Sequence, residues 1–305
     1  MPGKNKNETI QCLFCGITQG TQLERCAVIA AGIVFSVIVI HTGDMKKLSI
    51  VVVVALLFAA CASNPLTGKR TMAFVNNSSL FPSSFAQYSE FLKDNTVVTG
   101  TPDAELVAQV GERLAEAARK WLDAEGFSHY LDAYQWEINL VRDNTVNAWC
   151  LPGGKIVVYT GILPVTQTEE GLAVVLGHEI CHALLNHGQQ RMSAGILQDI
   201  GSVAVSIMTE SESTREAYST GSTVLGTLPF SRSHESEADH YGLILMAIAG
   251  YNPDAAVPFW QRMAALGGGT LEFLSTHPSD TTRIRQLQGW VPGARQKAAE
   301  FGVQF

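Results

Sequence analysis

The sequence predicts a mostly helical α+β fold in which a small β-sheet directly precedes a long buried helix. Its 305 residues are 46% hydrophobic and 16% charged, which is enough apolar material for a full core. Residues 134–141 alternate apolar and polar side chains as a strand does, and residues 146–150 and 156–160 flank a Pro-Gly-Gly turn. Residues 169–186 instead carry apolar side chains at helical spacing.

Further helices are expected on both sides of this core. Pro102 and Asp103 form a helix start, and residues 103–122 place apolar side chains on one face. The other expected helices span residues 85–93, 192–208, 231–249, 253–266, 280–290 and 292–301. Residues 210–227 are dense in Ser, Thr and Gly, so we expect a mobile loop that is near enough in sequence to serve as a lid.

The charge balance excludes one class of partner. A net charge of −7 and a pI near 5.6 provide no basic surface of the kind that binds nucleic acid. Residues 192–208 are apolar but hold Gln198 and Asp199 in mid-run, which favours a soluble helix over a membrane span.

The N-terminal region has the pattern of a processed leader. Residues 45–60 join a short basic start to an apolar run and a pair of small residues, as a secretory signal does. Because Cys61 follows at once, the segment resembles a bacterial lipoprotein signal, in which Cys61 becomes the lipidated N-terminus. Residues 1–44 are then an overlong gene start, 61–77 a tether and 78–305 the folded domain. An uncleaved membrane anchor is the alternative.

After such cleavage only Cys61, Cys150 and Cys181 remain in the chain. Cys150 and Cys181 are candidates for a disulfide in an oxidising compartment, or for small buried apolar residues. The sequence leaves both interpretations open.

The chemistry centres on the pentapeptide from His178 to His182. Residues four apart on a helix share a face, so two imidazoles can converge on one metal ion. Glu179 then lies beside the site, where a carboxylate can take a proton from an attacking water. The spacing is that of the His-Glu-x-x-His zinc motif. The alternative is a helix with two surface histidines, which its apolar neighbours disfavour.

A third ligand is expected in residues 231–240, which open another helix. Glu235 and Asp239 are four apart on one face, so Glu235 can bind the metal while Asp239 accepts a hydrogen bond from a ligand histidine. His234 and His240 are the competing ligands. A motif with its third histidine at position 188 is excluded, because that residue is glycine.

Together these motifs resemble the gluzincin metallopeptidase family of the CAAX prenyl proteases and HtpX, and most of all its periplasmic lipoprotein branch. The likeness rests on HEICH at 178–182, SRSHESEAD at 231–239, NAWCLPGG at 147–154, YTG at 159–161 and HPS at 277–279, and covers roughly residues 65–290.

The resemblance implies a zincin-like metalloprotease domain with one zinc ion per chain on His178, His182 and Glu235. Glu179 is then the base, Asp239 a hydrogen-bond partner of a ligand, and His277 a residue near the metal. Either His277 or Tyr241 is the candidate oxyanion donor. In zincins the strand nearest the metal commonly pairs with an extended substrate, and Asn147, Ala148 and Trp149 are the candidate edge; a purely structural hairpin is the alternative.

The function expected from these features is a zinc endopeptidase of the bacterial cell envelope that cleaves misfolded or unassembled envelope proteins. The alternative is a periplasmic chaperone or outer-membrane protein assembly factor with little proteolysis. The expected partners are polypeptide substrates, a membrane through the lipid on Cys61, and outer-membrane assembly machinery. The expected location is the periplasm, anchored to the outer rather than the inner membrane.

Overall fold

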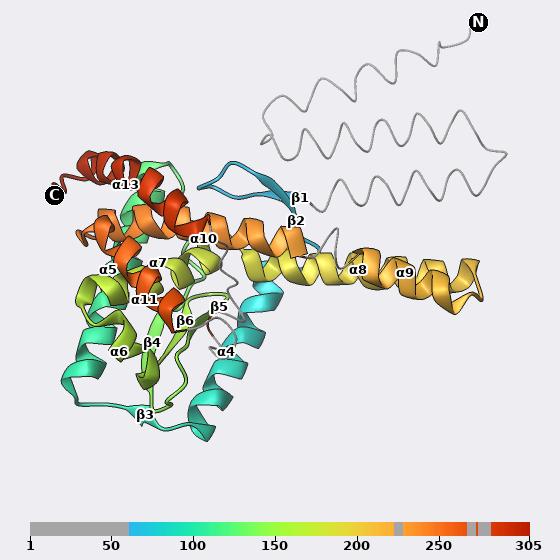
Figure 1. The fold of residues 1–305 in the computed structure, drawn as a ribbon, viewed down its shortest axis with the longest axis horizontal. Helices are drawn as coiled ribbons and strands as arrows, with labels where there is room; N and C mark the ends of the chain where they lie inside the picture. The colour runs from blue at the N-terminus through green and yellow to red at the C-terminus, as the bar shows by residue number, and fades with distance from the viewer. Residues whose placement is uncertain (1–60, 223–227, 267–272, 274–281) are drawn as a thin grey trace, which may run out of the picture. The chain divides into compact units, whose positions relative to one another are not determined.

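The structure, a computed structural model, describes residues 61–222, 228–266, 273 and 282–305. Within it, Ala62–Phe305 forms one compact unit. The predicted signal segment, residues 45–60, and the predicted overlong start, residues 1–44, lie outside the described residues. A mostly helical α+β domain with a small sheet is found, as the sequence predicts (Figure 1).

The main sheet of the described chain has the strand order β3-β4-β6-β5. Strands β5 (Ala148–Leu151) and β6 (Lys155–Tyr159) form the predicted antiparallel hairpin, closed by Gly153 and Gly154 at φ 87° and 91°. Only glycine adopts such angles without strain, which explains the Gly-Gly turn. Strand β4 (Glu137–Val141) runs parallel to β6, and β3 (Val97–Val98) pairs antiparallel with β4.

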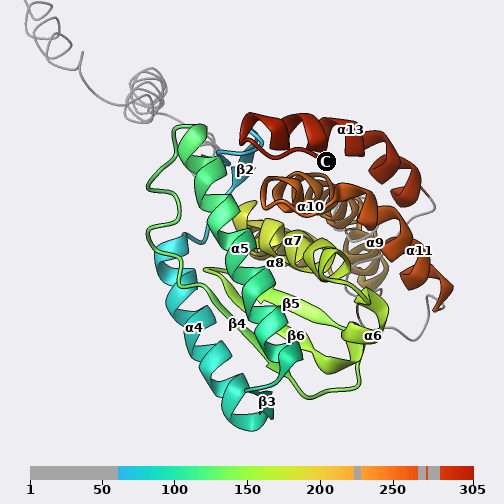
Figure 2. The same ribbon diagram turned by 90° about the vertical axis from the view of Figure 1, so that its left-hand side faces the viewer.

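The two faces of the sheet pack against different helices. Leu140, Ile156 and Val158 belong to the main core with α5 (Pro102–Ala124) and α7 (Glu169–Leu184). Val141 and Val157, which alternate with them, pack with Tyr88 of α4 (Asn77–Asp94). The strand period of two thus divides apolar side chains between two layers of helices, visible in Figure 2.

The remaining elements follow the sheet in chain order. After β6 come η1 (Thr160–Ile162), α6 (Leu163–Thr166), α7, α8 (His187–Met208), α9 (Glu212–Ser222), α10 (Leu228–Ile248), η3 (Pro253–Ala255), α11 (Ala256–Ala265) and α13 (Arg283–Glu300). Helices α7, α10 and α11 agree with the predicted helices to within three residues, whereas α8 begins five residues and α4 eight residues before the predicted start. In three further places the prediction was wrong.

The segment predicted as a mobile loop contains a helix, α9. Its Ser- and Thr-rich composition favours a loop, but α9 returns along α8 and packs on it. Gly201 of α8 makes room for this contact, because a Cβ atom there would lie 1.8 Å from the Tyr218 hydroxyl. Tertiary contact therefore outweighs weak intrinsic propensity. Residues 223–227 of the predicted loop lie outside the described residues.

The two predicted C-terminal helices are one helix, α13, with Pro292 inside it. A proline in a helix interior costs about 3 kcal/mol. The buried residues Leu287, Ala294 and Ala298 continue one face across the proline, and this face packs on the domain. Burial on both sides of Pro292 offsets its cost.

The predicted tether is part of the fold. It forms strands β1 (Cys61–Ser63) and β2 (Arg70–Met72). Asn64 between them is 5% exposed and donates a 2.8 Å hydrogen bond to the carbonyl of Leu184, at the end of α7. The polar composition that indicates a linker here supplies turn and capping contacts instead.

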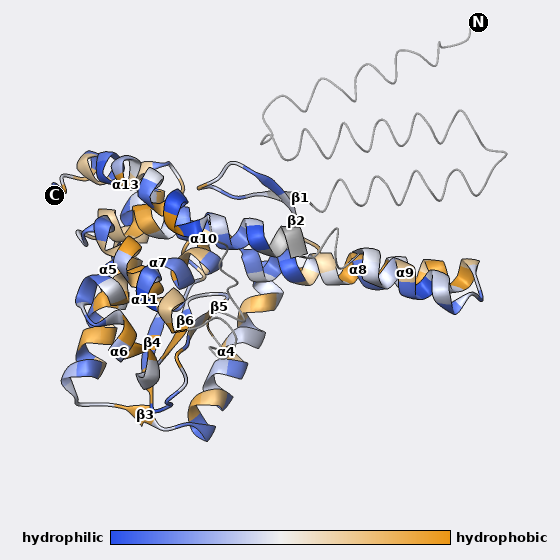
Figure 3. Cartoon of the chain, in the orientation of Figure 1, coloured by the Kyte–Doolittle hydropathy of each residue, from blue (hydrophilic) through white to orange (hydrophobic). Residues whose placement is uncertain are grey.

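Helices α8 and α9 extend away from the rest of the domain (Figure 1). Apolar residues recur among hydrophilic ones along α8 (Figure 3), and several of them are exposed, including Ile200, Val203 and Ile207. Within the part of the chain that the structure describes, no helix has the length and apolar character needed to cross a membrane.

Candidate active site

Helix α7 carries the His-Glu-x-x-His motif in the centre of the domain. Thr168 caps its N-terminus, and its side chain accepts a 3.0 Å hydrogen bond from the Gly171 amide. Every residue from Gly171 to Leu184 is buried. The two motif histidines are therefore held in the core, at 1% exposure for His178 and 5% for His182.

Helix α10 lies against α7 at a contact between two glycines. A Cβ atom on Gly177 would lie 3.0 Å from the Gly242 carbonyl oxygen, and one on Gly242 would lie 2.9 Å from the His178 amide nitrogen. Side chains would hold the two backbones apart at this point. The close approach places the acidic residues of α10 within reach of the histidines of α7.

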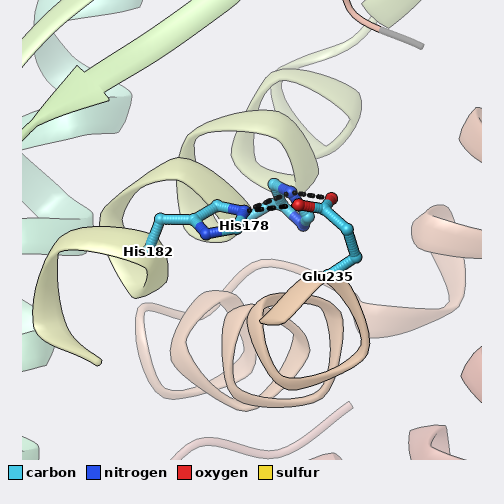
Figure 4. Close-up of side chains that lie close together, drawn as sticks. All are labelled: His178, His182 and Glu235. Atoms are coloured by element: carbon cyan, nitrogen blue, oxygen red, sulfur yellow. Dashed lines mark hydrogen bonds and ion pairs between the residues drawn. The ribbon is translucent and has the colours of Figure 1, made fainter. Parts of the chain in front are cut away.

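Three side chains converge to form a candidate metal centre: His178 and His182 of α7 and Glu235 of α10 (Figure 4). The two Nε2 atoms lie 3.0 Å apart. The Glu235 carboxylate lies 3.3 Å from His178 Nε2 and 3.4 Å from His182 Nε2. Two nitrogens bound to one tetrahedral zinc ion at about 2.05 Å are roughly 3.3 Å apart, so these residues fit zinc.

Asp239 contacts the Nδ1 side of the His178 ring, while Nε2 faces the candidate metal centre. Its Oδ1 is 2.9 Å from His178 Nδ1. Burial opposes the charged imidazole, but the hydrogen bonds and charges of Asp239 and Glu235 outweigh it and raise the pKa of His178 to about 9. When His178 offers Nε2 to a metal, its Nδ1 carries the hydrogen and donates to Asp239, which fixes tautomer and ring orientation.

Arg283 of α13 completes this arrangement, a role that the sequence did not specify. Its Nε and Nη2 atoms donate to the two oxygens of Asp239 at 2.5 and 2.7 Å, and its guanidinium lies 3.4 Å from the ring centroid of Trp260. Burial raises the pKa of Asp239, and the Arg283 and His178 contacts more than reverse this, so the net shift is downward. Asp239 is therefore held as a carboxylate.

Glu179 is 2% exposed and belongs to the same turn of α7 as His178, although it is not one of the three converging residues. Its position is consistent with a base beside the metal rather than a ligand. Burial, together with the Glu179 charge, raises the pKa of the Cys150 thiol.

Strand β5, which contains Ala148 and Trp149, is at an edge of the sheet and contacts α7. Asn147 immediately precedes it. The side chains of Asn147 and Ala148 are buried, whereas Trp149 is partly exposed and its indole donates to the Tyr159 hydroxyl at 3.3 Å. An edge strand next to the candidate metal centre is what substrate pairing requires. The pairing itself stays a prediction.

Of the two predicted oxyanion donors, the structure describes only Tyr241. Tyr241 lies six residues after Glu235 on α10, which turns its side chain about 120° away from that of Glu235. Its ring stacks on Trp121 of α5 instead, with centroids 6.0 Å apart. His277 lies outside the described residues.

Cys150 and Cys181 are both free thiols. Burial raises the pKa of each. The structure thus shows no disulfide between Cys150 and Cys181, one of the two interpretations that the sequence left open. His234 and His240, the competing ligands, are likewise not among the three converging residues.

Comparison of the sequence with known proteins identifies a family. The model of peptidase family M48 matches residues 106–291, which include every residue of the candidate metal centre. The chain is 40% identical to the mitochondrial metalloendopeptidase OMA1 of Schizosaccharomyces pombe over 168 residues, which are 53% of this chain and 49% of OMA1. It thus spans about half the length of that relative.

Two bacterial proteins are also similar. The metalloprotease YcaL of Escherichia coli is 28% identical over 193 residues, covering 62% of this chain and 73% of YcaL. A Vibrio cholerae protein named as a beta-barrel assembly-enhancing protease is 27% identical over 209 residues, covering 65% of this chain and 41% of that protein. With a family match over more than half of its length, the chain belongs to peptidase family M48, whose members are zinc metallopeptidases.

Proposed function

We propose that this chain is a zinc endopeptidase of the bacterial cell envelope that cleaves misfolded or unassembled envelope proteins. The observation that carries the endopeptidase activity is the convergence of His178, His182 and Glu235 around one point, with Glu179 buried in the same turn of α7. Three protein ligands that leave one position for water are typical of catalytic zinc. A structural zinc site has four protein ligands.

The chemistry follows from the roles of these residues. Zinc held by the three side chains would polarise the scissile carbonyl and lower the pKa of a bound water toward about 7. Glu179 takes the proton of the attacking water and passes it to the leaving amine. Asp239, held as a carboxylate by Arg283, keeps His178 in the tautomer that presents Nε2. The edge of β5 would align an extended substrate.

Metal content and cleavage of an unfolded protein test the proposal together. We expect the purified full chain to hold one zinc ion and to cleave casein. Chelation should remove both zinc and cleavage, and added zinc should restore both. A chain that cleaves casein equally well after complete zinc removal would contradict the proposed function.

We further propose that Cys61 is lipidated and anchors the protein in the periplasm, at the outer membrane. The support is the pattern of residues 45–61: a basic start, an apolar run and Ala59-Ala60 before the cysteine. In bacteria fed a palmitate analogue, the wild type should carry the label and sediment with membranes. Cys61→Ser should do neither. An unlabelled wild type would reject the anchor.

A second candidate is a chaperone or outer-membrane assembly factor that cleaves rarely. The observation in its favour is the similarity to the Vibrio cholerae protein with the beta-barrel assembly name. The two candidates differ in what they require of Glu179. If a Glu179→Gln chain restores outer-membrane protein levels in cells lacking the wild type, the assembly function is independent of cleavage.

A further inference from the structure

His182 has its own chain of hydrogen bonds, separate from the one that holds His178. The Nδ1 atom of His182 lies 2.8 Å from Nδ1 of His187, and Nε2 of His187 lies 3.3 Å from a carboxylate oxygen of Glu237. Glu237 also pairs with the ammonium group of Lys69. His187 is the first residue of α8 and is 0% exposed.

A sharp turn of the backbone at Asn186 brings His187 to its position beside His182. Asn186, between α7 and α8, has φ 57° and ψ 33°, in the left-handed region that asparagine tolerates better than most residues. This turn ends α7 and folds the next residue back toward His182. The two rings meet edge to face, with centroids 4.9 Å apart.

The direction of each hydrogen bond follows from the metal site. A neutral imidazole that offers Nε2 to zinc carries its hydrogen on Nδ1, so His182 is the donor in the bond to His187. The acceptor, Nδ1 of His187, then has no hydrogen. His187 carries it on Nε2 and donates to the Glu237 carboxylate.

We propose that His187 is a positioning residue that holds His182 in the tautomer and orientation needed to bind zinc, with Glu237 and Lys69 holding His187 in turn. The inference rests on the proposed role of His182 as a ligand. Each ligand histidine is then supported by a chain that ends in a cation, since His178 contacts Asp239 and Asp239 accepts a hydrogen bond from Arg283.

Two further contacts fix the His187 ring. The His234 ring stacks on it with centroids 4.1 Å apart and an interplanar angle of 12°. Gln190 Oε1 lies 3.1 Å from His234 Nε2, which anchors the stacked ring. His234, which the sequence offered as a candidate ligand, thus packs against His187, the residue that contacts the ligand His182.

The outer end of this chain of residues reaches the segment that the sequence predicts to be a tether. Lys69 and Glu237 line a cavity of about 320 Å³ together with Asn64, Arg70 and His234. Lys69, which lies between strands β1 and β2, thereby adds a positive charge beside Glu237, the residue that contacts His187.

Zinc affinity of the full chain, measured by competition with a chromophoric chelator, tests the inference. We expect His187→Phe, which keeps the ring volume but removes the acceptor, to weaken zinc binding about 10- to 100-fold. His187→Asn places an oxygen where Nδ1 lies and should stay within about threefold of the wild type. His240→Phe, the same kind of change on the neighbouring helix α10, should match the wild type.

The outcomes separate this inference from the proposed function. Wild-type affinity in His187→Phe, or equal losses in His187→Phe and His187→Asn, would overturn the positioning role. Should His187→Phe fail to fold, the comparison of Glu237→Leu with Glu237→Gln replaces it, with the larger loss expected for leucine and equal affinities counting against the inference. His182→Ala is measured alongside: if it binds zinc like the wild type, the proposed metal site itself fails.

Discussion

Glu179→Gln is expected to lower the rate of casein cleavage about 10²- to 10⁴-fold, the range typical of a lost general base. Glutamine has nearly the same shape as glutamate but cannot accept the proton of the attacking water. The three metal-binding side chains are untouched, so the variant should still hold one zinc ion. Initial cleavage rates and metal content, measured on the same preparation, check both parts.

The matched control for this experiment is Glu170→Gln, the same change in the first turn of α7. It lies two helical turns before the motif and should cleave casein at the wild-type rate. If Glu179→Gln loses zinc along with activity, Glu179 contributes to metal binding rather than to proton transfer. If its cleavage rate is unchanged, another residue is the base.

Asp239→Ala is expected to lower the free energy of unfolding of the zinc-free protein by about 3–5 kcal/mol, the usual result of breaking a buried ion pair. Arg283 is 4% exposed and makes two hydrogen bonds to Asp239, so the variant leaves a buried guanidinium group without its hydrogen-bonded carboxylate. The Glu235 carboxylate, 3.7 Å from Nη2, remains as a more distant partner. The same change removes the acceptor for His178 Nδ1, which should also weaken zinc binding. Urea unfolding in the presence of a chelator isolates the stability effect.

Two companion variants make this test specific. Asp239→Ala combined with Arg283→Leu removes both charges and should recover much of the lost stability. Glu116→Ala breaks exposed pairs with Arg119 and Lys120 and should cost less than about 1 kcal/mol. An Asp239→Ala variant no less stable than Glu116→Ala would show that the Asp239–Arg283 pair contributes little.

The sequence predicted the parts of the site that depend on spacing within one helix. His178, Glu179 and His182 lie on α7, and Glu235 and Asp239 lie four apart on α10, so helical geometry alone fixes which of them share a face. The convergence of the two helices also agrees with the prediction. What spacing cannot show is how closely two helices pack, which here depends on Gly177 and Gly242.

The features that the sequence did not reveal join distant segments. Arg283 meets Asp239 across 44 residues, and only the packing of α13 determines which acidic group it finds. Asn64 reaches Leu184 across 120 residues from a stretch whose composition is that of a linker. The Ser- and Thr-rich composition of α9 indicated a loop, and Pro292 indicated the end of a helix. In both places tertiary contacts outweigh the local preference.

The glycine contact between α7 and α10 also bears on protein design. Because only backbone separates the helices beside His178, the position of Glu235 relative to the histidines is a property of the helix pair and of neither helix alone. Grafting the pentapeptide motif onto a helix of another scaffold would transfer two ligands without the third. A transplantable version of this metal centre is therefore the pair of helices α7 and α10, with both glycines kept.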